Sequence, residues 1–74
     1  MSKAIVGKSY RHYKGSEYQV IGLGLHTETG EEFVIYKASM NDTQTEKFWL
    51  RPRKMFEEKV MVEGVHVDRF SLVE

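Results

Sequence analysis

The sequence predicts a mainly β domain, and two observations carry this prediction. Apolar residues recur at every second position in short runs, which is the period that places alternate side chains on the two faces of a strand. Turn-forming segments that contain glycine, asparagine or acidic residues separate these runs. At 74 residues the chain has room for one small domain, residues 1–74, and it shows no internal repeat.

Four strands are expected before the single proline, Pro52. They are residues 10–14, 18–27, 32–39 and 47–51. Gly22 and Gly24 lie on one side of the second strand, where they permit the sharp bend or the close backbone approach that a tightly curled sheet needs. Gly30 accepts a positive φ and marks the turn of a hairpin between the second and third strands. The polar stretch 41–46 is expected to be a loop.

Pro52 lacks an amide hydrogen and suits the start of a helical turn, so residues 53–58 are expected to form one turn. Met55 and Phe56 are expected to anchor this turn over one end of the barrel. Valines at alternate positions on both sides of Glu63-Gly64 predict a final hairpin, whose second strand is expected to continue through residues 70–72. Small size and glycine bends favour an antiparallel Src-homology-3-like barrel of about five or six strands, with a sandwich as the alternative.

Composition limits the classes of function. The 11 basic and 11 acidic residues give no net charge, so contact with nucleic acid requires a local patch. No apolar run is long enough to span a bilayer or to form a signal-peptide core, so we expect a cytoplasmic location and no membrane partner. Without cysteine the domain has no disulfide, and stability must come from packing or association, which leaves a homodimer open.

Several segments occur in the order of a known family's landmarks. They are YRHYKG from Tyr10, YQVIG from Tyr18, HTET from His26, VIY from Val34, WLRP from Trp49 and MF from Met55. On these residues the chain resembles the bacterial domain of unknown function 1653 family over nearly its whole length. Residues 38–42 depart from the family's Tyr-Gly turn, and Asp68 replaces its proline before Arg69-Phe70. The resemblance implies a small β-barrel-like bacterial protein of unassigned activity, and it names no substrate or cofactor.

Rings and cations gather in two runs, residues 10–15 and 48–53. In the second run Phe48 and Leu50 share one side, interpreted as the core side, so Trp49 and Arg51 are expected to face outward or into a groove. Trp49 either covers the open end of the barrel or binds a ligand, whereas Tyr13 is expected to pack at the barrel rim. The candidate ligand-binding face comprises Arg11, His12, Tyr36, Trp49, Arg51 and Arg69.

Catalytic and metal sites find little support in the sequence. The serines lack a glycine-flanked elbow and a nearby base, and Gly22 and Gly24 lie within a strand rather than in a phosphate-binding loop. His26 and the acids Glu28, Glu31 and Glu32 lack the spacing of a transition-metal site, so a solvated acidic turn is the favoured interpretation. We therefore expect no enzyme activity, no metal and no cofactor.

Two classes of function remain. A non-catalytic binding module would use the aromatic–basic face for single-stranded nucleic acid, because rings stack on bases and cations hold phosphates. The alternative is a protein-interaction or self-associating adaptor domain that binds a peptide or its own copy, which the zero net charge favours. The expected partner is accordingly nucleic acid or protein.

Overall fold

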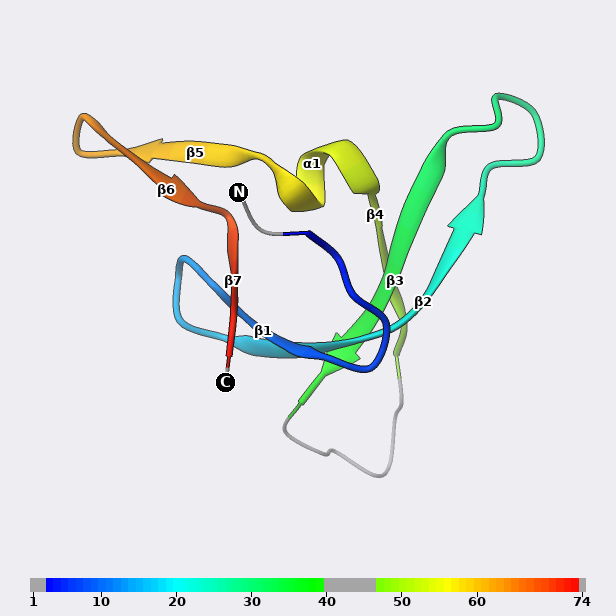
Figure 1. The fold of residues 1–74 in the computed structure, drawn as a ribbon, viewed down its shortest axis with the longest axis horizontal. Coiled ribbons are helices and arrows are strands. Elements are labelled where there is room, and N and C mark those ends of the chain that lie inside the picture. Colours follow the sequence, from blue (N-terminus) through cyan, green and yellow to red (C-terminus); the bar gives the residue numbers. More distant parts are fainter. Residues whose placement is uncertain (1–2, 40–46, 74) are drawn as a thin grey trace.

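Two antiparallel sheets and one short helix make up the fold (Figure 1). The computed structural model describes residues 3–39 and 47–73, and the loop expected at residues 41–46 lies outside the described residues. The elements are β1 Ser9–His12, β2 Glu17–Leu25, β3 Glu32–Ala38, β4 Trp49–Pro52, α1 Arg53–Glu57, β5 Lys59–Val62, β6 Val65–Asp68 and β7 Phe70–Leu72. The mainly β prediction is confirmed, and the first four expected strands differ from the observed ones only at their ends.

The larger sheet has the strand order β4-β3-β2-β1-β7 and is antiparallel throughout. β4 and β7 are its two edges and do not pair with each other in the described part of the chain, so the sheet is not closed into a barrel. The expected barrel of five or six strands is therefore wrong in its closure and its strand number, because the described residues form seven strands in two sheets. The Src-homology-3-like detail stays a prediction. The expected continuation of the final hairpin through residues 70–72 is wrong, because β7 separates from β6 at Arg69 and pairs with β1. This pairing places Phe70 in the core, fully buried.

β2 bends where the glycine spacing indicates. The register between β2 and β3 shifts between Val20 and Gly22, which marks a bulge. Gly22 then lies opposite Ile35 and Gly24 opposite Phe33. A Cβ atom on Gly24 would lie 3.5 Å from Ile35 Cδ1, so the absent side chain lets Ile35 pack directly on the backbone of β2.

β5 and β6 form a separate hairpin that extends away from the larger sheet (Figure 1). Its loop residues Glu63 and Gly64 have φ values of 50° and 80°. Two consecutive positive φ values are typical of the type I′ turn, whose twist matches that of the flanking strands. The prediction of a hairpin around Glu63-Gly64 is confirmed.

Aromatic rings fill the core where α1 packs against the larger sheet. The buried residues are Ala4, Tyr10, Val20, Val34, Tyr36, Phe56 and Phe70. Phe56 of α1 stacks on Phe70 of β7 with ring centroids 4.0 Å apart and planes 6° apart. Tyr10 and Tyr36 both meet the Phe56 ring in T-shaped geometry. Phe56 therefore anchors α1 as expected, whereas Met55 is 40% exposed and does not.

Candidate functional site

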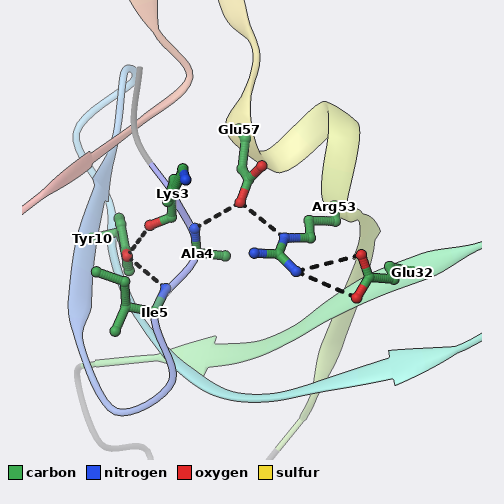
Figure 2. Close-up of polar contacts among 7 residues, drawn as sticks. All are labelled: Lys3, Ala4, Ile5, Tyr10, Glu32, Arg53 and Glu57. Carbon is green, nitrogen blue, oxygen red and sulfur yellow. Dashed lines mark hydrogen bonds and ion pairs between the residues drawn. The ribbon is translucent and has the colours of Figure 1, made fainter.

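Two arrangements of polar side chains border the aromatic core. The first ties the N-terminal segment to α1 and β3, and we call it the latch network (Figure 2). Its members are Lys3, Ala4, Ile5, Tyr10, Glu32, Arg53 and Glu57. The Tyr10 hydroxyl donates to the Lys3 carbonyl and accepts a hydrogen bond from the Ile5 amide at 2.8 Å. The Ala4 amide donates to Glu57 Oε2 at 2.9 Å, so residues 3–5 are fixed at both ends.

Arg53 lies between two carboxylates in the latch network. Its Nε donates to Glu57 Oε2 at 3.0 Å, and its Nη1 lies 3.3 Å from Glu32 Oε2. Burial alone would raise the pKa of Glu57, but the hydrogen bond from Ala4 and the hydrogen bond and charge of Arg53 outweigh it, and the pKa is lowered. Arg53 and the nearby Lys3 offset the charges of Glu32 and Glu57, which is typical of a structural contact.

The second arrangement surrounds Phe70, and we call it the rim cluster: His12, Arg51, Arg69 and Phe70. The Arg51 guanidinium lies over the Phe70 ring, with Cζ 5.6 Å from the ring centroid. The His12 imidazole contacts the same ring nearly at a right angle, with centroids 5.0 Å apart. The cluster therefore brings together side chains from β1, β4 and the start of β7.

Arg51 is fixed by two contacts. Its Nε donates to the Tyr36 hydroxyl at 3.2 Å, and its guanidinium lies over Phe70. Within residues 3–39 and 47–73 no carboxylate pairs with Arg51, and its Nη groups have no hydrogen-bond partner. Tyr36 is only 5% exposed, so this candidate residue positions Arg51 from within the core.

Backbone contacts bring Arg69 beside His12. The amide of Tyr13, the residue that follows His12, donates to the Arg69 carbonyl at 2.9 Å. Arg69 Nη2 lies 2.8 Å from Glu58 Oε1, but Arg69 Nε is buried without a partner among the described residues. Arg69 is therefore the partly neutralised cation of the rim cluster.

The environment of His12 favours its neutral form. Burial lowers the pKa of His12 from its usual 6.5, and the positive charges of Arg51, Arg69 and Lys14 lower it further. The Lys14 amide donates to Nδ1 at 3.2 Å, which assigns the remaining ring proton to Nε2. At neutral pH His12 is thus an uncharged N–H donor in a positive surrounding.

β4 presents the opposite faces from those expected. Trp49 pairs with the buried Tyr36, so Trp49 and Arg51, two residues further on, lie on the core side of the sheet. Phe48 and Leu50 are 53% and 63% exposed, and their interpretation as the core side is wrong. Alternation gives the period of a strand, whereas the buried side depends on which face meets the rest of the protein. Trp49 itself is 49% exposed at the edge of the core.

The candidate residues do not all share one surface. His12, Arg51 and Arg69 lie in the rim cluster, and Trp49 shares the face of Arg51. Arg11 points to the other side of β1, because the neighbouring Tyr10 is buried, and it pairs with Glu17 at 2.7 Å. Tyr13 is 41% exposed and its ring lies 4.6 Å from that of His12 between centroids, so its packing at a rim stays a prediction.

Sequence reasoning missed Phe70 as the ring around which the cations gather. It treated this residue only as part of a strand and as a family landmark after Arg69. The signal that was present is the pair Arg69-Phe70 itself, an aromatic residue beside a cation. Its contacts with β1 and β4 depend on pairing between distant segments.

A separate apolar groove of about 320 Å³ lies on the outer surface of the larger sheet. It is lined by Gly24, Leu25, His26, Phe33, Ile35 and Leu50. In the described part of the chain no group of three or more His, Cys, Asp or Glu side chains is placed to hold a metal ion. Nor does any described helix have the length and apolar character needed to cross a membrane.

Comparison with known proteins identifies the family to which the chain belongs. The model of the family described as protein of unknown function (DUF1653) matches residues 8–72. The chain is also similar to the crystal structure of a DUF1653 protein from Bordetella bronchiseptica, with 29% sequence identity and a TM-score of 0.76. The similarity covers 93% of this chain and 87% of that one. No curated protein matches significantly. Because the family model spans most of the sequence, the chain belongs to the DUF1653 family of proteins of unknown function.

Proposed function

We propose that the protein is a non-catalytic binding module that holds single-stranded nucleic acid against Trp49 and the rim cluster. The observation that carries this proposal concerns Arg51. Tyr36 and Phe70 hold its side chain in place, and no carboxylate among the described residues pairs with it. An arginine oriented before binding loses little side-chain freedom when it meets a phosphate. Its planar guanidinium also matches the geometry of phosphate oxygens.

Trp49 supplies the second part of the proposed interface. Its half-exposed indole lies on the same face as Arg51, and residues two apart on a strand are separated by roughly 7 Å. A base stacked on the indole therefore has its phosphate within reach of the arginine side chain. Such stacking contributes about 1–3 kcal/mol per base and tolerates any sequence.

The balanced charge of the chain limits the affinity. A single strand loses affinity with salt at a slope of about −0.7 in log K against log salt for each neutralised phosphate. If Arg51 and Arg69 each contact one phosphate, the slope is about −1.4. We therefore expect modest binding that weakens as salt increases.

Trp49 is the only tryptophan in the sequence, so its fluorescence reports this site alone. Titration with short single-stranded DNA and RNA at low salt is expected to quench this fluorescence, because a stacked base contacts the indole. Binding to dye-labelled oligonucleotides, followed by anisotropy, gives the affinity independently. If no oligonucleotide changes either signal at low salt, the proposal is wrong.

Two variants, each lacking one positive charge, distinguish binding at this site from general electrostatic attraction. Arg51→Met is expected to weaken binding several-fold and to reduce the salt slope by about 0.7. Arg11→Met is the matched control, because Arg11 is paired with Glu17 on the other side of β1. Equal losses in the two variants contradict a specific site at Arg51.

Self-association is a second candidate function, and the apolar groove on the outer sheet surface favours it. Leu50 at this groove is 63% exposed on the edge strand β4, a surface that a second copy of the chain could cover. Sedimentation at increasing protein concentration and high salt tests it, with Leu50→Arg as the disrupting variant. A monomer at every concentration contradicts this candidate.

A further inference from the structure

We propose that the rim cluster is a phosphate subsite in which His12 takes up a proton when phosphate binds. The inference rests on the proposed function for its ligand, a phosphodiester of single-stranded nucleic acid. It goes further in assigning the phosphate to particular donors and in making binding depend on pH. Free oxyanions share the same chemistry, and the experiment below distinguishes them from nucleic acid.

The geometry brings three donors from distant segments to one ring. His12 and Arg51 both contact Phe70, and Arg69 directly precedes it. Phe70 is fully buried, so the donors border an apolar interior, whose low dielectric constant strengthens charge-assisted hydrogen bonds. The Arg51 Nη groups lack partners among the described residues, and they are donors that a phosphate can satisfy. Arg69 Nε also lacks a described partner but is buried, so Arg69 contributes its positive charge to the subsite.

The charged groups near His12 are mainly positive on every element that packs against it. Arg51 lies on β4, Arg69 between β6 and β7, and Lys14 in the turn after β1. Two acids lie at this side. Glu58 is 48% exposed and pairs with Arg69 rather than with His12, and Asp68, the residue before Arg69, has its Oδ1 buried without a partner among the described residues. The ring of Tyr13 lies 4.6 Å from the imidazole between centroids. The free protein therefore disfavours the imidazolium form.

A bound phosphate reverses this balance. It offsets the charges of Arg51 and Arg69, which lower the pKa of His12 in the free protein, and it adds negative charge near the imidazole. The pKa of His12 then rises on binding, and one proton is taken up at Nδ1, which gives up its hydrogen bond from the Lys14 amide. By linkage, affinity increases as pH falls between the pKa of the complex and the pKa of the free protein, by at most about tenfold per pH unit.

Oligothymidylate is a suitable probe, because neither its phosphodiesters nor its bases titrate between about pH 5 and pH 8. NMR of the imidazole C–H signals gives the pKa of His12 in the free and saturated protein, and Trp49 fluorescence gives the affinity at each pH. We expect a higher pKa in the complex and tighter binding at the lower pH. His12→Gln is expected to lose the pH dependence, whereas the exposed His66, as His66→Gln, is the control that keeps it.

Sulfate, whose charge is constant in this range, is the second probe. If oligothymidylate quenches Trp49 equally at every pH and leaves the pKa of His12 unchanged, the phosphate subsite is overturned. Nucleic-acid binding then still stands. A rise in the His12 pKa with sulfate, without any response to oligothymidylate, supports an oxyanion subsite and overturns the nucleic-acid function. An unchanged pKa with both probes overturns the subsite outright.

Discussion

Arg51 and Arg53 flank Pro52, yet their guanidinium groups lie in opposite electrostatic surroundings. Arg53 in the latch network contacts two carboxylates, Glu57 at 3.0 Å and Glu32 at 3.3 Å. Arg51 in the rim cluster contacts a hydroxyl and a ring and, within the described residues, no carboxylate. The same residue type thus completes a contact in one region and leaves positive charge unbalanced in the other.

The two regions also show that lowered pKa values can have different meanings. The lowered pKa of Glu57 records hydrogen bonds and a positive charge that already stabilise its ionised form. The lowered pKa of His12 records burial and repulsion from three nearby cations, which disfavour its ionised form. The lowered pKa of Glu57 is typical of a contact that stabilises the fold. The lowered pKa of His12 is typical of a surface that an anion would complete.

The largest expected effect comes from Phe56, which joins the two regions by stacking on Phe70 and preceding Glu57. Phe56→Ala is expected to lower the free energy of unfolding by about 3–5 kcal/mol, because it removes a fully buried ring from a packed core. Its neighbour Met55 is 40% exposed, and Met55→Ala is expected to cost less than about 1 kcal/mol. Urea denaturation followed by circular dichroism measures both, and equal costs would contradict the observed packing of α1.

Breaking the latch network is expected to cost stability without affecting ligand binding. Glu57→Gln removes a charged acceptor from Ala4 and Arg53 and is expected to cost about 1–2 kcal/mol of unfolding free energy. Glu58→Gln is the matched variant one residue away, and its half-exposed pair with Arg69 is worth less than about 1 kcal/mol. The midpoints of urea denaturation compare the two variants. A larger loss of stability in Glu58→Gln than in Glu57→Gln would show that Glu58, not Glu57, makes the stabilising contact.

The pH dependence of stability separates the regions further. The pKa of Glu57 is lowered on folding, so its ionised carboxylate contributes to the free energy of unfolding. This contribution is fully present above the ordinary pKa of 4.5 and is lost as pH falls through the lower pKa of the folded state. Unfolding free energies measured from about pH 6 down to pH 3 are therefore expected to fall less steeply in Glu57→Gln than in the natural sequence. Parallel curves for the two proteins would show that Glu57 is not stabilised in its ionised form.

The smallest effect on stability is expected for the cations outside the latch network. Arg51→Met keeps an unbranched side chain over Phe70 but removes the donor to the Tyr36 hydroxyl, so it is expected to lower the unfolding free energy by about 1 kcal/mol. Arg11→Ala breaks only an exposed ion pair and is expected to stay within about 0.5 kcal/mol. Thermal unfolding of both variants checks this, and a large loss for Arg51→Met would make Arg51 a structural residue like Arg53.

Local patterns predicted the elements better than the site. The period of two, the glycine turns and Pro52 located the first four strands, the hairpin at Glu63-Gly64 and the helical turn to within a few residues. The candidate face included His12, Arg51, Arg69 and Trp49, but it also included Arg11, which lies on the other side of β1. Tyr36 was expected to contact the ligand, but it is buried and positions Arg51 instead.

The sequence by itself determined the β class, the hairpins and the end of β4, because each depends on neighbouring residues and their backbone preferences. The tertiary structure alone decided that β7 pairs with β1, that Trp49 rather than Leu50 faces the core side, and that the sheet stays open. Alternation is symmetric between the two faces of a strand, so only contacts with distant segments select the buried one. The gathering of Arg51, Arg69 and His12 around Phe70 follows from those contacts.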